Sequence, residues 1–391
     1  MSGGAGGAVA EAPVIVAARR TPIGTAQRSL AALTAPDLAA AVIADLAADL
    51  AAAPPERGVP GIGEVVLGNC TGPGGDVARV AALQAGLPDT VPGLTVDRQC
   101  ASGLAAVVLA VAVLRSEPGV VLAGGVESAS TAPWRFWPPA DGGAPTRYER
   151  APFAPATVGD PDMGPAADLL ARDSDVSRRC QDEYAARSHA RAAATQRAGG
   201  FDAEIVPVGG VARDERPRAG LSVDRLARLR PAFGPGGTVT AGNACGVNDG
   251  AALVTVVDAE THRRLGVPGL RVLATATAGV DPNRPGLGIV PAARLALDRA
   301  GLGLDQVDVV EFNEAFAGQV LACCAGLGLD PARVCPEGGA LALGHPWGAS
   351  GAVLAVRLFT QLVRRPGGRH GLAAIAAGGG QGVAMVVEAC R

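Results

Sequence analysis

Short apolar runs alternate along this chain with longer segments in which apolar residues recur every three to four positions. The short runs have the length and composition of buried strands and cover residues 14–18, 65–68, 120–124, 307–312 and 373–377. Residues 35–50 and 292–300 have the helical period instead. Strands that alternate with amphipathic helices predict an α/β fold.

Two stretches far apart in the chain share one pattern. Residues 100–109 (Cys-Ala-Ser-Gly-Leu-Ala-Ala-Val-Val-Leu) resemble 348–356 (Gly-Ala-Ser-Gly-Ala-Val-Leu-Ala-Val), and an apolar run ending in Gly-Gly follows each. This similarity predicts two related halves. Cys100 and Gly348 are equivalent in the repeat, so pseudo-twofold packing is expected to bring both helix starts, with Cys100 and His345, to one central site.

The repeat and the composition together divide the chain. Residues 1–12 are rich in Gly and Ala and are expected to be a disordered N-terminus. Residues 13–129 plus 248–268 form the predicted N-terminal half, and 269–391 the C-terminal half. Between them, 130–247 combine Pro/Trp-rich loops, a charged helix at 177–199 and turn clusters, which predicts an inserted domain of binding loops.

Composition excludes several classes of function. The net charge is -3 and the 34 cationic residues are scattered, which argues against nucleic acid or an anionic membrane as partner. All 34 are arginines, so Schiff-base lysine chemistry and Walker-type phosphate loops are excluded. No apolar run reaches the roughly 18 residues that a membrane span needs. We therefore expect a soluble, cytoplasmic protein that acts on a small molecule.

The eight cysteines contain no Cys-x-x-Cys pair and no nearby histidine at ligand spacing, so neither a metal site nor a disulfide framework is expected. Cys100 precedes an apolar helix expected over 104–114. The partial positive charge of a helix N-terminus favours the thiolate form, which is the nucleophile. A buried structural thiol is the common alternative for any single cysteine. The repeat relation to His345 favours a catalytic role.

His345 lies in a glycine-rich turn, residues 344–351 (Gly-His-Pro-Trp-Gly-Ala-Ser-Gly), that opens another apolar helix, which makes it a candidate base. The other three histidines fit ordinary structural roles. His189 lies within the charged helix and His262 beside two arginines, whereas His370 follows a Pro-Gly-Gly-Arg turn and is expected to be exposed.

Two further motifs follow predicted strands. Asn313 and Glu314 come directly after the strand at 307–312, where α/β proteins place ligands, although solvated surface polarity is an equal alternative. The Gly-Gly-Gly-Gln-Gly run that starts at Gly378 offers free amides for an oxyanion, or forms only a tight turn. The loop at 238–250 has the same two interpretations.

Taken together, these motifs resemble the thiolase family in order and spacing through nearly the whole chain. The matching segments are 20–24 (Arg-Thr-Pro-Ile-Gly), 96–103, 125–128, 229–233, 242–250, 313–316, 338–346 and 378–382. The resemblance implies a layered αβαβα fold of two related halves. It also implies a loop domain that holds coenzyme A, and a homodimer or homotetramer.

Carried over position by position, the resemblance makes Cys100 the nucleophile that takes the acyl group and His345 the base that activates it. Asn313 resembles the residue that joins His345, through water, in one oxyanion hole, and the amides of Cys100 and Gly378 resemble the other. The positions at which the family contacts coenzyme A or its pantetheine arm are Met163, Arg218, Phe233, Ala241, Cys245 and Phe316. The coenzyme A thioester is then a substrate, and no tightly bound cofactor is implied.

One departure from the family affects the chemistry. Thiolases carry a second cysteine two residues before the Gly-Gly-Gly run, which exchanges the proton at the α-carbon, and Ala376 stands there. There are three smaller departures. Asp162 stands where the family has a histidine, Cys245 where it has a serine, and Pro285 where methionine is common. Acylation of Cys100 is expected to survive this loss, whereas the carbon-carbon step also needs a base for an α-proton.

Three functions remain open from the sequence. The first is a thiolase-like acyl-CoA C-acyltransferase in which another group, such as Cys245, replaces the missing cysteine. The second is an acyltransferase or decarboxylative condensing enzyme of a biosynthetic pathway that needs no α-proton abstraction. The third, less favoured because nucleophile and base are both present, is a non-catalytic subunit that binds coenzyme A.

Overall fold

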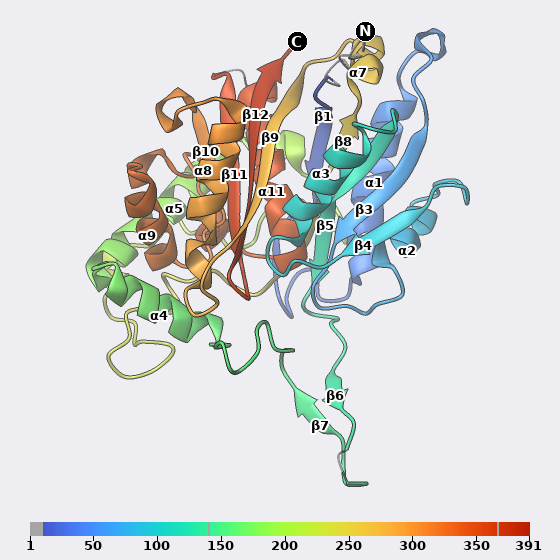
Figure 1. Cartoon of the computed structure of the whole chain (residues 1–391). Helices are drawn as coiled ribbons and strands as arrows, with labels where there is room; N and C mark the ends of the chain where they lie inside the picture. The colour runs from blue at the N-terminus through green and yellow to red at the C-terminus, as the bar shows by residue number, and fades with distance from the viewer. Residues whose placement is uncertain (1–10, 140, 366) are drawn as a thin grey trace, which may run out of the picture.

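The computed structural model describes residues 11–139, 141–365 and 367–391 (Figure 1). The disorder predicted for 1–12 lies outside the described residues, except for Glu11 and Ala12. The strands are β1 (Val14–Arg20), β2 (Gly24–Thr25), β3 (Ile62–Gly68), β4 (Gly93–Val96), β5 (Val120–Ser128), β6 (Arg135–Trp137), β7 (Thr146–Tyr148), β8 (Asn248–Val257), β9 (Gly269–Gly279), β10 (Val309–Phe312), β11 (His370–Ala377) and β12 (Gln381–Cys390). The α-helices are α1 (Ala35–Ala51), α2 (Val77–Gln84), α3 (Ser102–Val113), α4 (Met163–Asp173), α5 (Arg178–Arg197), α6 (Val223–Leu226), α7 (Ala259–Leu265), α8 (Ile289–Ala300), α9 (Ala317–Leu327), α10 (Ala340–Leu343) and α11 (Trp347–Phe359).

The strands form one large mixed sheet in the order β10-β11-β12-β9-β1-β8-β5-β3-β4, with β2 beside β8. Within each half, neighbouring strands pair over most of their length: β11 pairs with β12 in antiparallel register, and β5 pairs with β8. The halves join where β1 meets β9, through the pairs Val14↔Arg271 and Ile15↔Leu270 only. The mixed α/β architecture confirms the fold class expected from the alternating pattern.

The outer face of the N-terminal half is covered by α1 and α2. Thr34 and Asp37 form a capping box at the start of α1, because Asp37 N donates to Thr34 Oγ1 and Thr34 N donates to Asp37 Oδ2. Leu38, Val42 and Leu46, at successive turns of α1, are buried against the sheet. The apolar stripe read from the sequence is therefore the face that packs.

The outer face of the C-terminal half is covered in the same way by α8 and α9. Ala293, Ala296 and Leu297 of α8 pack with Val320 of α9 and with the side chains of β10 to β12 that face these helices. Small residues on α8 let the helix lie close to the sheet. The two halves thus repeat one plan, with a sheet and a pair of outer helices (Figure 1).

Helices α3 and α11 lie in the middle, between the two halves of the sheet (Figure 1). Their apolar residues form a single core with residues from both halves, and every residue of α11 from Gly348 to Phe359 is buried. A helix that is apolar on nearly all sides belongs in such a position. The resulting order of layers is helices, sheet, central helices, sheet, helices, as the resemblance implies.

The segment between the halves carries α4, α5, α6 and the two-stranded hairpin β6–β7, which extends away from the body (Figure 1). The charged helix is shorter than predicted, because Ser177 caps it and the chain turns after Arg197. Strand β10 also begins two residues later than expected. Among the described residues, no helix combines the length and apolar character needed to span a membrane.

Candidate active site

Cys100 lies in a tight turn between β4 and α3. Ser102 Oγ holds this turn, because it accepts from Arg98 N at 2.7 Å and donates to Gln99 O at 2.6 Å. Gln99 has φ +49°, a left-handed conformation that is costly for a residue with a Cβ atom. A strained turn fixed by the side chain of the first helical residue presents Cys100 in one orientation, directly before the N-cap residue Ala101.

His345 lies in the equivalent turn before α11. Its backbone N donates to Asn248 Oδ1 at 2.9 Å, and Asn248 Nδ2 donates in turn to Gly24 O at 2.8 Å. Gly344, at φ +115°, has its Cβ position only 2.5 Å from Asn248 Cγ, so a side chain there would displace Asn248. The β8 residue Asn248 therefore fixes the backbone that carries the histidine.

The two turns come together because α3 and α11 cross at glycines. A Cβ atom on Gly103 would lie 2.7 Å from Gly348 O, and one on Gly351 would lie 2.5 Å from Leu104 N. Residues larger than glycine would force the helices apart. This close packing brings Cys100 and His345 into the same cavity, as the internal repeat predicts.

The shared cavity is about 110 Å³ in volume and mostly apolar. Of the predicted site residues, it is lined by Cys100, Met163, Cys245, Asn313, Phe316, His345 and Gly378. Of the four positions at which the chain departs from the family pattern, Ala376 and Pro285 line it together with Cys245, whereas Asp162 does not. Both halves and the inserted segment thus contribute to a single cavity.

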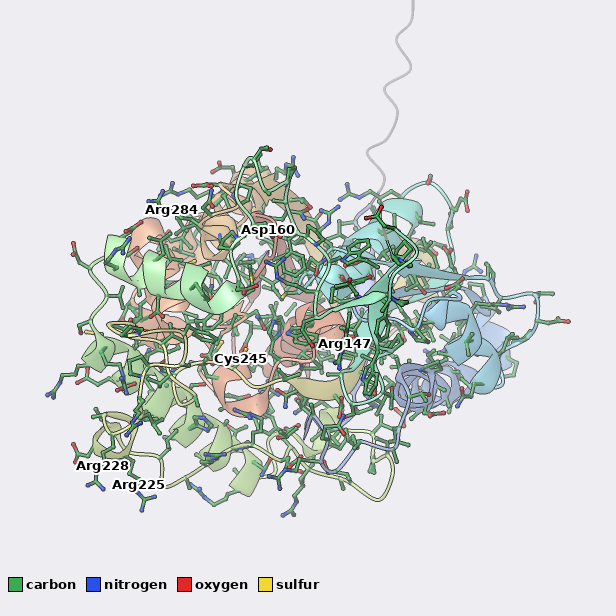
Figure 2. All side chains as sticks on the ribbon, turned by 90° about the horizontal axis from the view of Figure 1, so that it is seen from below. Arg147, Asp160, Arg225, Arg228, Cys245 and Arg284 are labelled. Carbon is green, nitrogen blue, oxygen red and sulfur yellow. The ribbon has the colours of Figure 1, made fainter. Side chains whose placement is uncertain are left out.

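Three predicted contacts lie outside the cavity lining. Arg218 and Ala241 are exposed on the surface. The ring of Phe233 packs over Gly164 at the start of α4, close enough that a Cβ atom there would overlap it, and borders a neighbouring surface hollow. Figure 2, viewed from the face that carries α4 and the hairpin, shows Cys245 near the centre and Arg225 and Arg228 at the edge.

The environment of Cys100 corrects one expectation. Burial raises the pKa of the Cys100 thiol to about 12, and the backbone N–H groups of Cys100 and Gly378 oppose this only in part. The thiolate predicted from the helix start is therefore wrong for the resting protein. Desolvation outweighs the partial charge of a few amides, so Cys100 is a neutral thiol that needs a base.

His345 provides that base in its neutral form. Its Nδ1 atom lies 2.6 Å from Ser350 Oγ, and Ser350 gives its only hydroxyl hydrogen to Pro346 O at 3.0 Å. Ser350 Oγ must then accept from Nδ1–H, which leaves the lone pair on Nε2. Among the described residues Nε2 has no hydrogen-bond partner although it is buried, and burial lowers the pKa of His345 to about 4.

Asn313 and Glu314 are both buried, so the alternative of solvated surface polarity is wrong. Asn313 lines the cavity, and its backbone N donates to Ala374 O at 3.0 Å. Glu314 points the other way and accepts from Tyr184 Oη at 2.8 Å and Ser188 Oγ at 2.7 Å. Asn313 is therefore available to a ligand in the cavity, whereas Glu314 anchors α5 to the C-terminal half.

Three residues that support the site were not predicted from the sequence to be functional. They are Ser350, Asn248 and Glu127, whose buried carboxylate accepts from Gly348 N at 3.0 Å. The His-x-x-x-x-Ser spacing across the start of a helix was the available signal for Ser350. The other two lay within quoted motifs, but their partners are distant in sequence and could not be inferred.

The remaining histidines lie away from the cavity. His189 is buried, and its pKa falls to about 4 through burial and the nearby Arg216 and Arg218. His262 Nε2 lies 2.9 Å from Val267 O. The expectation that His370 is exposed is wrong, because its side chain is only 15% exposed and its Nδ1 lies 3.1 Å from Gln306 O.

Comparison with known proteins gives consistent matches over both halves. Residues 13–260 match the family model of the thiolase N-terminal domain, and 267–389 that of the thiolase C-terminal domain. An acetyl-CoA acetyltransferase of Pseudomonas aeruginosa is 43% identical over 96% of this chain and 98% of its own length. A beta-ketoadipyl-CoA thiolase of the same organism is 44% identical, covering 94% of this chain and 97% of its own.

A solved structure agrees with these sequence matches. The crystal structure of the Bacillus anthracis acetyl-CoA acetyltransferase superimposes with a TM-score of 0.87 at 36% identity. The match covers 98% of this chain and 100% of that one. The likeness therefore extends through both halves and the inserted segment.

Proposed function

The chain belongs to the thiolase family, and from this premise we propose that it is an acyl-CoA C-acyltransferase that carries the acyl group on Cys100 as a thioester. One observation carries the proposal. Cys100, His345, Asn313 and Gly378, from four separate segments, line the same apolar cavity. Nucleophile, base and oxyanion donors are the parts that acyl transfer to a thiol requires.

Loading of the enzyme follows from the protonation states. His345 Nε2 accepts the proton of Cys100, whose sulfur attacks the carbonyl carbon of the acyl-CoA. The amides of Cys100 and Gly378 donate to the carbonyl oxygen as it gains charge. When the bond to the coenzyme A sulfur breaks, His345 returns the proton to that sulfur, and free coenzyme A leaves. Asn313, through a water, and His345 form the other oxyanion hole, which binds the carbonyl oxygen of the second acyl-CoA.

The binding residues extend from this cavity to the surface. Met163, Cys245 and Phe316 line the cavity and contact the pantetheine arm in the proposed complex. The exposed Arg218, with Phe233 and Ala241, contacts the outer part of coenzyme A, where its phosphates need cationic partners. We place the boundaries of the coenzyme A-binding loop domain at 130–247, between halves formed by 13–129 plus 248–268 and by 269–391.

A homodimer or homotetramer completes the proposal. The β6–β7 hairpin and the residue before it expose three large aromatic side chains, of which Trp134 is 73% exposed. Trp137 stacks on Tyr148 with ring centroids 4.5 Å apart, which stiffens the hairpin. Exposed aromatics on a projecting hairpin support an interface with another copy. A cytoplasmic location stays a prediction.

One observation favours a second function. Ala376 lines the cavity where the family pattern has a cysteine, and its methyl group cannot take a proton. An acyltransferase that passes the acyl group to an amine or alcohol, or a condensing enzyme that generates its carbanion by decarboxylation, would not need that cysteine. Both would still load Cys100 as described.

The intact mass of the protein after brief mixing with acetoacetyl-CoA tests the proposal, with Cys100→Ala as control. An acetyl adduct that the control lacks would show cleavage of the carbon-carbon bond and support C-acyl transfer. An uncleaved acetoacetyl adduct would support the second function instead. Tight acyl-CoA binding without an adduct from any acyl-CoA would contradict both and leave a binding protein.

A further inference from the structure

Making a carbon-carbon bond between two thioesters requires a group that removes a proton from the α-carbon of the second one. The question of which residue does so rests on the function proposed above. Three of the side chains that line the cavity can exchange a proton with a bound substrate: Cys100, His345 and Cys245. Cys100 holds the acyl group during this step, so only the other two are available.

His345 has another task at that moment. As the new bond forms, the sulfur of Cys100 leaves the acyl carbon with a negative charge and needs a proton donor nearby. His345 could accept the α-proton itself only if the same nitrogen reached the α-carbon first and the Cys100 sulfur afterwards. A second side chain that exchanges protons at the cavity wall removes this requirement, because it accepts the α-proton while His345 stays beside the Cys100 sulfur as the donor.

Cys245 is held in place at the cavity wall by its backbone. Its N donates to Ala315 O at 2.9 Å, and Ala317 N donates to Asn243 O at 2.9 Å, so the loop pairs with the segment that follows Asn313. Within the described part of the chain, the Cys245 thiol forms no hydrogen bond. The thiol is thus fixed in position and free to meet a substrate.

A cation lies next to this thiol. A Cβ atom on Gly246 would overlap the guanidinium of Arg216, which places that charge directly against the loop. In the described ranges Arg216 has no ion pair, and its Nε is buried without a hydrogen-bond partner. Burial raises the pKa of Cys245 to about 12, and Arg216 acts against that rise. An unpaired arginine beside a thiol stabilises its thiolate.

We propose that Cys245, assisted by Arg216, accepts the α-proton in place of the cysteine that is missing at position 376. After loading, the neutral His345 takes the Cys245 proton. The Cys245 thiolate then removes a proton from the α-carbon of the second acyl-CoA, and the released electron pair forms the bond to the acyl carbon. The bond from that carbon to the Cys100 sulfur breaks, and His345 gives its proton to this sulfur. Both cysteines end as thiols.

Solvent exchange isolates this step from loading. Acetyl-CoA is incubated with the protein in D₂O, and deuterium at its α-carbon is followed by mass spectrometry, while intact mass reports the acetyl adduct on Cys100. Cys245→Ser keeps the size of the side chain but not an accessible anion. Because Cys245 also lines the pantetheine site, the adduct is compared at saturating acetyl-CoA, where it should still form, and the exchange rate per acylated protein should fall about a hundred-fold or more, the usual value of general-base catalysis.

Two further variants make the result specific. Cys180→Ser, an exposed cysteine on α5 that is remote from the cavity lining, should exchange like the unchanged protein. Ala376→Cys, added to Cys245→Ser, should restore exchange by placing a thiol at another position in the wall of the same cavity. A merely structural defect at position 245 would not be repaired in this way.

The outcomes separate this inference from the function on which it rests. Exchange that is equally fast in Cys245→Ser, or absent from the unchanged protein although Cys100 is acylated, would overturn the role of Cys245 and leave acyl transfer intact. Exchange that is fast in Cys245→Ser but lost in a His345 variant would assign the α-proton to His345. Absence of any Cys100 adduct in the unchanged protein would overturn the proposed function itself.

Discussion

His345 Nδ1 and Ser350 Oγ lie 2.6 Å apart, at the start and one turn into α11. The pairing depends on the first turn of the helix, where Ser350 Oγ reaches back toward the turn that carries His345. It also depends on Pro346, whose carbonyl accepts the Ser350 hydrogen and so makes the serine an acceptor for the imidazole. A single buried hydroxyl thereby decides which nitrogen of the base faces the cavity.

Removing that hydroxyl should slow loading of the enzyme. In Ser350→Ala the imidazole can take either tautomer, so part of the population presents Nε2–H, which cannot accept the Cys100 proton. We expect acylation to slow about tenfold, short of the roughly hundred- to ten-thousand-fold that a complete general base contributes. Quenched-flow mass spectrometry measures the rate. The exposed Ser116→Ala is the control, and an unchanged rate in Ser350→Ala would refute the tautomer assignment.

Replacing Glu127 should weaken the contact between the halves. Its carboxylate, on β5, accepts from Gly348 N at 3.0 Å and from Cys70 N and Thr71 N at 3.1 Å each. Glu127→Ala leaves these buried donors unpaired, at about 1–3 kcal/mol for each such group. We expect a loss of at least that much in the free energy of unfolding, measured by urea denaturation. The exposed Glu117→Ala should change it by less than about 0.5 kcal/mol.

The sequence predicted the α/β fold and the meeting of Cys100 with His345 because both depend on local patterns, whereas the order of the layers was implied by the family resemblance. Apolar periodicity set the helix faces, and the Ala-Ser-Gly repeat marked α3 and α11 as an equivalent pair. The glycines at which these helices cross lie in the same repeat, so the shared cavity followed from it. The family resemblance then supplied Asn313 and Gly378, which periodicity alone left undecided.

The ionisation of Cys100 and the surroundings of Cys245 could not be predicted from the sequence. The amides at the helix start favour the Cys100 thiolate, but burial of the thiol in the folded protein outweighs them. Arg216 is 29 residues from Cys245 in the chain, and only the folded loop places the two together. Charges and burial that come from distant segments have no signature in a local motif.

Enlarging Gly286 should restrict the acyl groups that the enzyme accepts. Gly286 lines the cavity, and a Cβ atom there would lie 2.8 Å from Gln319 Cγ and 2.9 Å from Leu170 Cδ2. Gly286→Ala therefore narrows the apolar end of the cavity. Loading from hexanoyl-CoA should fall about tenfold or more relative to acetyl-CoA, since one lost methylene site is worth roughly 1–3 kcal/mol. Equal loss for both substrates would instead indicate a general disturbance of the site.

Acid should destabilise the buried ion pairs around Glu204. Burial alone would raise the pKa of this carboxyl, but Arg357 and Arg20 reverse the effect and hold it below its usual value. A carboxyl with a lowered folded pKa stabilises the protein above its unfolded pKa of about 4.3, and that contribution is lost as pH falls through the folded value. The free energy of unfolding should therefore decrease below about pH 4.

Glu204→Gln provides the test of this assignment. The variant should be less stable at neutral pH, because two buried guanidinium groups lose their shared carboxylate. Its stability should also depend less on pH below about 4 than that of the unchanged protein. Urea denaturation from pH 3 to 7 measures both. Parallel curves for the two proteins would show that other carboxyls cause the acid sensitivity.

The rate of Cys100 acylation should be nearly independent of pH through the neutral range. Burial raises the pKa of Cys100 to about 12 and lowers that of His345 to about 4, so neither group titrates between about pH 5 and 9. The reactive pair is a neutral thiol and a neutral imidazole, and the proton moves only as the sulfur attacks. Below pH 5 the rate should fall as His345 becomes protonated and can no longer accept that proton.

Rapid-quench acylation with acetyl-CoA from pH 4.5 to 9 tests this, and alkylation by iodoacetamide is the independent check. Thiolate at Cys100 should be a very small fraction at pH 8, so alkylation should be slow and rise with pH without a plateau. An inflection between pH 6 and 8 in both rates would mean that a thiolate-imidazolium pair forms before substrate binds.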